Sequence, residues 1–406
     1  MPMLRSSVLL LAALLAPALA SADDWPHFRG LARNGTSSEK SWRSEWPGEP
    51  PIAWKAQVGL GFSSIVVANG RAATAGHADG HDTVFCFDAA TGKPIWKHSY
   101  AAELGDKFFE GGTTGTPTFD GARLFWLSRW GDLFCFEAAD GKIVWQKNIQ
   151  KETGAPLPMW GFTGTPLVSG VAGNLLVLNV GEAGVALDKA DGKIVWQSAA
   201  KDAGYSTPLP FESGGAKLAL FGNATNYLAV DPVTGKEAWR FRWVTQYGVN
   251  AADPIVSGDR VFISTGYGKG GALLQLGGDE PKQLWKTKAL RTQLNAAVLF
   301  DGYLYGVDGD TTDKGSLKCI EFATGTEKWS QPGFGNGAVI VADGKLIALS
   351  GDGELSIAPA SPVAFKPTAH AKVLGPKCWT APMLANGLVY CRNSRGEIVV
   401  VDLRGK

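Results

Sequence analysis

Beyond its first 22 residues the sequence lacks any apolar run long enough to span a membrane, for which a helix needs about 20 residues. It also lacks a charge surplus, since 39 basic and 38 acidic residues give a formal net charge of +1. Arg5 is the only charge in residues 1–22, so the remaining 38 basic and 38 acidic residues cancel. Nucleic acids and anionic membranes attract basic proteins. Neither kind of partner is expected.

Cysteine is scarce, and the number of cysteines is odd. The five thiols cannot all form disulfides within one chain. Cys86, Cys135 and Cys319 stand inside apolar segments, which favours small buried thiols. Cys378 and Cys391 flank one expected hairpin, and whether they pair stays open.

Histidine is equally rare, with five residues in the chain. His77, His81 and Asp82 stand close together, and such side chains can ligate a metal. No third ligand is indicated, so we interpret the segment as a polar loop and predict no metal site. No arrangement of serine, histidine and aspartate indicates a catalytic residue.

The first residues, MPMLRSSVLLLAALLAPALASA, have the features of a secretory signal peptide. Arg5 precedes an apolar run, and small residues offer a cleavage site before Asp23. No cysteine follows that site, so no lipid anchor is expected there. We predict a signal peptide at 1–22, an N-terminal extension at 23–50 that packs on the remainder, and a periplasmic or secreted protein.

One pattern recurs along the chain. It reads FDAATGKPIWK at 87–97, FEAADGKIVWQ from Phe136 and VDPVTGKEAWR from Val230. A looser copy without the tryptophan ends at Phe365. A period in the forties, with strand-forming composition, is typical of β-propeller blades. The tryptophans of the repeat are Trp54, Trp96, Trp145, Trp196, Trp239, Trp285 and Trp329.

The ends of the repeat determine the number of blades. Eight final strands are expected, from residues 52–57 to the segment VAFK, and eight three-strand units, from residue 61 to EIVVVDL at 397–403. The first final strand and the last unit must complete each other. We therefore predict an all-β fold: one eight-bladed propeller at 51–406, with four antiparallel strands per blade, closed by pairing its N- and C-terminal strands.

The repeated residues have a structural interpretation. The acidic residue ends the third strand, glycine makes the turn, and tryptophan stands on the fourth strand. Its ring can cover the adjacent blade while its N–H donates to a carbonyl of a neighbouring turn. We predict that all seven tryptophans dock between blades.

Two copies carry a resemblance to a known family. Asp188, Gly192 and Trp196, like Asp231, Gly235 and Trp239, fit the tryptophan-docking motif of the pyrroloquinoline-quinone (PQQ) repeat superfamily. The segment DWPHFRG resembles exported propellers described as BamB-like. The resemblance implies a non-catalytic binding or scaffold module without a cofactor, monomeric, whose partner is an envelope protein or a small ligand.

The same superfamily implies an alternative. Its quinoprotein alcohol and sugar dehydrogenases bind PQQ with Ca²⁺, and many of them have adjacent cysteines. This chain has no adjacent cysteines and is shorter than those enzymes. A PQQ-dependent oxidoreductase remains the alternative.

A binding site is expected at one mouth of the channel. Segments before the innermost strands, and loops between second and third strands, must open there. Aromatic, amide and charged side chains in these places suit a peptide, a glycan or a small ligand. A channel filled only with solvent is the other interpretation. The candidate residues are Arg129, Trp130, Trp160, Glu182, Tyr205, Asn250, Asn295 and Trp379.

Overall fold

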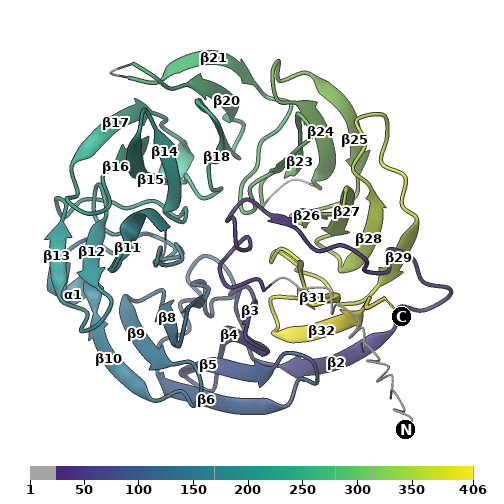
Figure 1. Cartoon of the computed structure of the whole chain (residues 1–406), viewed down its shortest axis with the longest axis horizontal. Coiled ribbons are helices and arrows are strands. Elements are labelled where there is room, and N and C mark those ends of the chain that lie inside the picture. Colours follow the sequence, from purple (N-terminus) through teal and green to yellow (C-terminus); the bar gives the residue numbers. More distant parts are fainter. Residues whose placement is uncertain (1–23, 169, 279, 312–313, 406) are drawn as a thin grey trace, which may run out of the picture.

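The structure is a computed structural model that describes residues 24–168, 170–278, 280–311 and 314–405. The signal peptide predicted for residues 1–22 lies outside the described residues. The described strands form eight sheets arranged in a ring (Figure 1), which confirms the eight-bladed propeller. The strands of a blade are antiparallel and follow one another from the channel outward, with two exceptions: the strand Thr36–Ser37 is added in parallel to blade 7, and the outer strand of blade 8 comes from near the start of the chain.

The strands of the first four blades run in sequence order. Blade 1 contains β3 (Val66–Ala68), β4 (Arg71–Ala78), β5 (His81–Asp88) and β6 (Pro94–Ala101). Blade 2 contains β7 (Thr118–Asp120), β8 (Arg123–Leu127), β9 (Asp132–Glu137) and β10 (Ile143–Asn148). Blade 3 contains β11 (Leu175–Leu178), β12 (Val185–Asp188) and β13 (Ile194–Gln197), with a bridge from Leu167 to Val177 at the inner edge. Blade 4 contains β14 (Leu209–Ser213), β15 (Ala216–Gly222), β16 (Asn226–Val230) and β17 (Glu237–Arg242).

The last four blades include the two strands that come first in the chain. Blade 5 contains β18 (Ile255–Ser257), β19 (Arg260–Thr265), β20 (Gly270–Gln275) and β21 (Lys282–Thr287). Blade 6 contains β22 (Val298–Phe300), β23 (Tyr303–Asp308), β24 (Ser316–Glu321) and β25 (Glu327–Pro332). Blade 7 contains β26 (Ala338–Ala342), β27 (Lys345–Leu349), β28 (Glu354–Pro359) and β29 (Ala369–Lys372), with β1 (Thr36–Ser37) added inside. Blade 8 contains β30 (Met383–Ala385), β31 (Leu388–Arg392), β32 (Glu397–Asp402) and β2 (Ile52–Gln57).

Helices are short among the described residues. They are α1 (Ile149–Thr153) and the 3₁₀ turns η1 (Gly170–Ala172) and η2 (Gln246–Gly248). None of them is long and apolar enough to cross a lipid bilayer.

Ring closure follows the prediction. β2 is the outer strand of blade 8 and pairs antiparallel with β32, from Ile52 opposite Val401 to Gln57 opposite Glu397. The pairing joins distant parts of the chain in one sheet, and it leaves no open gap in the ring.

The outer strand of blade 7 differs from the expectation. The segment VAFK was predicted to be this strand, which is wrong: β29 begins only at Ala369. Pro362 and Pro367 flank the segment, and proline cannot donate to a strand ladder. Phe365 instead packs against Trp329, with 5.9 Å between ring centroids.

Five of the seven repeat tryptophans donate their indole N–H to a turn of the next blade, whereas the N–H groups of Trp239 and Trp285 have no partner among the described residues. Indole N–H groups donate to main-chain oxygens there, as from Trp54 to Ala89 (2.9 Å) and from Trp96 to Ala138 (3.0 Å). The turn glycine lies directly under the ring, since a Cβ on Gly92 would approach the Trp54 ring to 2.5 Å. Any larger residue at such a glycine would displace the ring. The corresponding bonds run from Trp145 to Lys189, Trp196 to Pro232 and Trp329 to Ser361.

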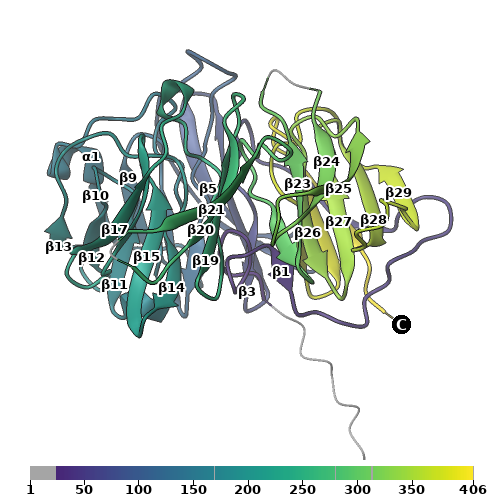
Figure 2. The same cartoon turned by 90° about the horizontal axis from the view of Figure 1, so that it is seen from above.

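The N-terminal segment 24–37 crosses one face of the ring. It pairs with blade 1 through Trp25 and Val67, accepts from Phe119 of blade 2 through the oxygen of Pro26, and adds β1 in parallel to β26 of blade 7. It therefore spans the channel. Figures 1 and 2 show the N-terminal stretch in purple, with β1 on one face of the ring and the chain continuing over blades 7 and 8.

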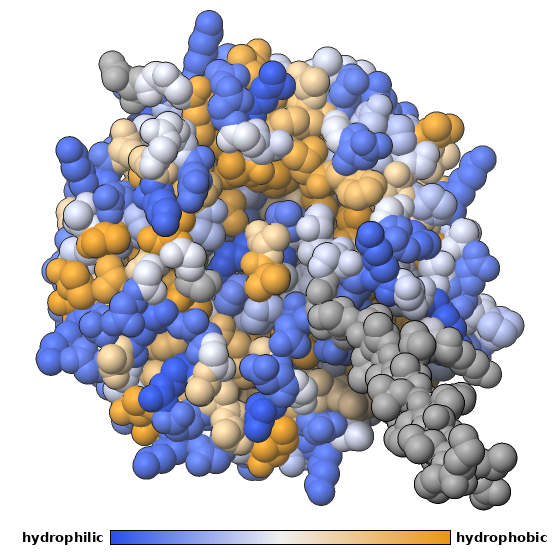
Figure 3. All heavy atoms as spheres, in the orientation of Figure 1, coloured by the Kyte–Doolittle hydropathy of each residue, from blue (hydrophilic) through white to orange (hydrophobic). Residues whose placement is uncertain are grey.

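Beyond this crossing the chain is held by blade 8. The Glu39 carboxylate accepts from the backbone N–H groups of Asn386 (2.6 Å) and Gly387 (2.8 Å), and Trp42 is buried beside Arg404. On the face drawn in Figure 3, hydrophilic residues cover much of the rim and hydrophobic ones form smaller groups.

Candidate functional site

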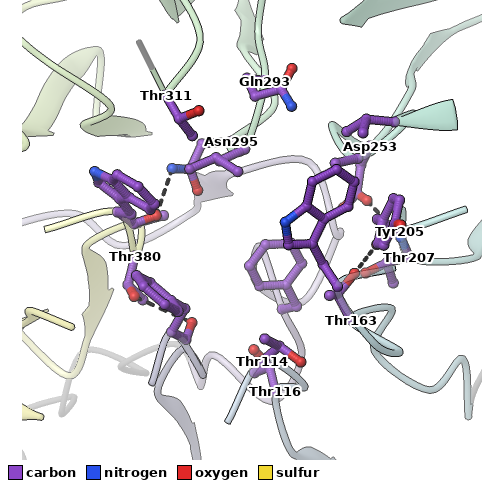
Figure 4. Close-up of a pocket in the computed structure, with 18 of the residues that line it drawn as sticks. Thr114, Thr116, Thr163, Tyr205, Thr207, Asp253, Gln293, Asn295, Thr311 and Thr380 are labelled. Atoms are coloured by element: carbon purple, nitrogen blue, oxygen red, sulfur yellow. Dashed lines mark hydrogen bonds between the residues drawn. The ribbon is translucent and has the colours of Figure 1, made fainter. Parts of the chain in front are cut away.

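A cavity of about 410 Å³ lies in the channel. Figure 4 shows Thr114 and Thr116 on one side, opposite Gln293 and Asn295. Its volume falls within the usual range for small-ligand sites. The lining residues are Phe28, Phe62, Phe108, Phe109, Thr114, Thr116, Trp160, Thr163, Thr165, Tyr205, Thr207, Val249, Ala251, Asp253, Tyr267, Gln293, Leu294, Asn295, Thr311, Trp379, Thr380 and Ala381.

Most of the polar lining comes from lead-in segments, the residues just before each innermost strand. Residues two apart in one extended segment point the same way. The lining pairs are accordingly Thr114 with Thr116, Thr163 with Thr165, Tyr205 with Thr207, Ala251 with Asp253, and Gln293 with Asn295. In four of these pairs a proline follows the second member, as Pro117 follows Thr116. This recurring X-x-[Thr/Asp]-Pro pattern is a sequence signal for the lining that the prediction missed.

Hydrogen bonds connect the lead-in segments from blade to blade. Thr116 Oγ1 accepts from the Ser64 N–H (2.9 Å), and Thr207 Oγ1 accepts from the Thr165 N–H (3.2 Å). The Asp253 carboxylate accepts from the Thr207 N–H at 2.7 Å. The polar wall is therefore built into the ring and is preorganised before any ligand arrives.

None of the described lining residues belongs to blade 7. Its lead-in segment has glycines at 333, 335 and 337. Asn295 of blade 6 instead donates to the main-chain oxygen of Trp379 in blade 8, over 2.8 Å. The lack of side chains at these glycines leaves room for this contact between blades 6 and 8.

Two groups of aromatic rings face the cavity. Phe62 stacks on Trp379, with centroids 5.4 Å apart, and also contacts Phe109. In the second group Trp160 meets Tyr205 edge to face at 5.7 Å, and Phe108 at 5.9 Å. The Phe108 side chain is half exposed at the mouth.

The N-terminal segment closes the base of the cavity. Phe28 lines it, and Arg29 beside Phe28 is buried and donates to the main-chain oxygens of Ala296 and Ala297, each at 2.8 Å. Because this segment spans the channel, the cavity is a pocket open at one end.

Two ionisable groups at the base, Asp253 and His27, have pKa values far from their ordinary ones. Burial raises the pKa of Asp253 to about 6, although nearby Arg29 and Arg33 act in the opposite direction. Burial, followed by repulsion from Arg33, lowers the pKa of His27 to about 3, so this imidazole is neutral. Among the described lining residues, Asp253 is the only acidic or basic one.

Four of the eight residues predicted for the site line the pocket: Trp160, Tyr205, Asn295 and Trp379. The lining residues that the prediction missed include Phe28, Phe62, Phe109 and Asp253. Phe28 and Asp253 come from parts of the chain far apart in sequence, so no local pattern relates them.

The structure places the other four predicted residues behind or beside the lining. Arg129 donates to the main-chain oxygens of Leu104, Gly112 and Trp160, and Trp130 donates to that of Glu103. Glu182 forms ion pairs with Lys201 (2.8 Å) and Arg240 (3.4 Å). Asn250 is fully buried and donates to the main-chain oxygens of Asn223 and Trp243. Main-chain carbonyls, which the sequence does not display, account for three of these placements.

The histidine-rich segment is a hairpin between β4 and β5. His77 Nδ1 and Asp82 Oδ1 are buried and 2.7 Å apart, so they partner each other, while Asp82 Oδ2 has no hydrogen-bond partner among the described residues. The described residues contain no cluster of three or more histidine, cysteine or acidic side chains suited to a metal ion. All five cysteines are free and buried, Cys378 and Cys391 included.

The eight blades, the tryptophan-to-glycine contacts and the lead-in segments define a propeller built from PQQ-type repeats. A family model described as outer membrane protein assembly factor BamB matches residues 81–331, and the chain belongs to this family. A search of curated proteins found no significant match.

Solved structures share the fold at low sequence identity. BamB from Moraxella catarrhalis is 15% identical, with a TM-score of 0.65 over 87% of this chain and 100% of that one. Quinohemoprotein alcohol dehydrogenase from Comamonas testosteroni is 14% identical, with a TM-score of 0.66 over 94% and 81%. A europium-containing methanol dehydrogenase is 14% identical, with a TM-score of 0.67 over 93% and 89%. These likenesses concern the fold and leave function to the site.

Proposed function

We propose that the chain is a binding module whose ligand enters the open pocket between Trp160 and Trp379. The observation that carries the proposal is a preorganised cavity of about 410 Å³ that has aromatic walls, a polar wall and a closed base. Such pockets combine apolar contact area with a few oriented polar groups. The ligand is a small molecule or the end of a larger envelope component.

The lining argues against PQQ as that ligand. PQQ is a flat quinone with several carboxylates, and carboxylates are held by arginine, lysine or clustered N–H donors. The charged side chain among the described lining residues is Asp253, an acid that would repel it. Arg29 lies behind the wall and is committed to main-chain oxygens. The residues present do not fit the cofactor, and we derive no oxidation step.

The test compares both functions on one sample. Purified protein is titrated with PQQ, with and without Ca²⁺, and followed by visible absorbance and dye reduction. We expect neither a bound quinone spectrum nor alcohol-dependent reduction. A stoichiometric spectrum with turnover would establish the quinoprotein alternative.

Export to the periplasm or the medium, and a monomeric state, belong to the same proposal. A cleaved N-terminus in the envelope or medium fraction would support export. Retention of residues 1–22 in the cytoplasm would contradict it.

A further inference from the structure

We propose that the pocket binds a neutral saccharide, taken end-on as the terminal sugar of a glycan. The inference rests on the proposed function, namely that this pocket is the binding site. It follows from the charge of the pocket, its two kinds of wall and its closed base.

Charge excludes strongly ionic ligands. An anion would meet Asp253 without a basic partner among the described lining residues. A cation would meet rings whose faces are already approached by cations, since Lys377 Nζ lies 4.9 Å from the Trp379 centroid and Arg129 lies 5.0 Å from that of Phe109. Arg29 and Arg33 also act on Asp253 from behind. A neutral ligand avoids all of these costs.

The polar wall excludes a purely hydrocarbon ligand. Twelve of the lining residues carry a hydroxyl, amide or carboxyl group, and Thr116, Thr207 and Asp253 are examples. An apolar ligand would remove water from these groups without replacing its hydrogen bonds. A ligand with many hydroxyls can donate and accept around the same ring.

The aromatic walls suit the apolar faces of a sugar ring. A pyranose presents C–H groups on its faces and hydroxyls around its edge. The C–H groups pack on the negative face of an aromatic ring, which Trp160 can offer, while Trp379, stacked on Phe62, belongs to the second aromatic wall. Hydroxyls at the sugar edge then meet the lead-in segments.

The closed base determines how a glycan enters. Phe28 and the segment behind it block passage through the channel. A chain therefore cannot thread, and only its terminal unit reaches Asp253. An extended peptide, which is also neutral and rich in donors, needs length along its strand that a pocket closed at one end does not give.

The experiment uses purified full-length protein and defined probes. Maltotriose, cellotriose and triacetylchitotriose are tested beside choline and a blocked neutral tetrapeptide, by tryptophan fluorescence and saturation-transfer NMR. We expect at least one trisaccharide to bind, with the strongest saturation transfer on a terminal unit. Trp160→Ala and Trp379→Ala should weaken that binding at least about tenfold.

Trp46→Ala is the matched control, because Trp46 is a half-buried tryptophan of the N-terminal extension outside the lining, and it should change affinity less than about twofold. Binding of choline or the peptide that depends on Trp160, without saccharide binding, overturns the saccharide and leaves the pocket function standing. Saccharide binding that neither pocket variant weakens, or saturation spread evenly over all units, overturns the end-on pocket. No trisaccharide binding below about 10 mM also overturns the proposal. The NMR measurement on the unsubstituted protein remains decisive if a variant fails to fold.

Discussion

The indole N–H of Trp145 in blade 2 donates to the main-chain oxygen of Lys189 in blade 3, over 2.9 Å. Trp285, at the same repeat position in blade 5, has a buried N–H without a partner among the described residues. The two tryptophans therefore share ring burial and differ in one hydrogen bond.

Phenylalanine at each position separates these contributions. Trp145→Phe should cost about 1 kcal/mol more of unfolding free energy than Trp285→Phe, because only the first loses a hydrogen bond and leaves a carbonyl unpaired. Denaturant unfolding measures both. Equal losses would show that the bond adds nothing to the docking of the ring.

Steric contact under the ring gives a second prediction. Gly192 and Gly70 both have φ near +72°, but a Cβ on Gly192 would lie 2.9 Å from the Trp145 ring, and one on Gly70 would meet nothing within 4 Å. Both alanine variants should lose about 1 kcal/mol through the left-handed backbone. Gly192→Ala should lose about 1–3 kcal/mol more through overpacking. Similar melting temperatures for the two variants would contradict a tight contact.

Ring closure is tested by two deletions. A chain that starts at residue 58 lacks β2 and leaves β32 with a free edge, so we expect loss of the cooperative transition in calorimetry and association in size-exclusion chromatography. A chain that starts at residue 51 keeps β2 and is the control, and should stay monomeric. An unchanged melt of the shorter chain would contradict closure by this pairing.

His27 should make stability depend on pH. Its pKa is about 3 in the fold and near 6.5 in an unfolded chain, so its stabilising contribution is complete above pH 6.5 and is lost as pH falls toward 3. The loss is about 1.4 kcal/mol per pH unit within this window. His27→Gln should flatten the stability profile between pH 6.5 and 4.

Asp253 provides a control, because its contribution to stability should change with pH in the opposite direction to that of His27. Its raised pKa of about 6 makes its contribution complete below pH 3.8 and lost as pH rises through 6. Asp253→Asn should therefore gain stability relative to the parent at pH 7 and not at pH 4. If His27→Gln keeps the parent's acid slope, other groups determine that slope.

Arg129 is expected to hold the loop that carries Phe108 and Phe109. Its guanidinium donates to the main-chain oxygens of Leu104 and Gly112, both at 3.3 Å. Arg129→Gln should speed hydrogen exchange of residues 103–112 about tenfold, which corresponds to about 1.4 kcal/mol. Arg240→Gln, which removes an arginine with acidic partners on the surface, is the control and should leave this loop unchanged. Unchanged exchange in Arg129→Gln would assign the loop's order to other contacts.

The fold was predictable because its signals are local and repeated. Turn residues between apolar runs, such as Asp140 and Gly141, mark hairpins, and regular tryptophans mark blades. Closure followed from comparing the two ends of the repeat. The prediction for the outer strand of blade 7 was wrong because this strand lacks the tryptophan and follows prolines, so the repeat offered no marker for β29.

Half of the residues predicted for the candidate site line the pocket. Trp160 and Trp379 interrupt the repeat and do line the pocket, since lead-in segments must face the channel. Arg129 and Asn250 interrupt it equally, yet their side chains are taken up by main-chain oxygens that only the folded ring brings near. The base combines Phe28 of the N-terminal segment with Asp253 of blade 5, and no repeat position relates these two residues.

The pairing of β2 with β32, which forms the seam of the ring, also determines when folding can be completed. Because Ile52 pairs with Val401, near the other end of the chain, blade 8 stays incomplete until nearly the whole ring sequence has been synthesised. Contacts between residues so distant in sequence form slowly. Meanwhile the strand edges on both sides of the seam remain available to other chains. In the last step of folding, β32 therefore pairs with β2 of the same molecule in competition with β2 of a neighbouring molecule.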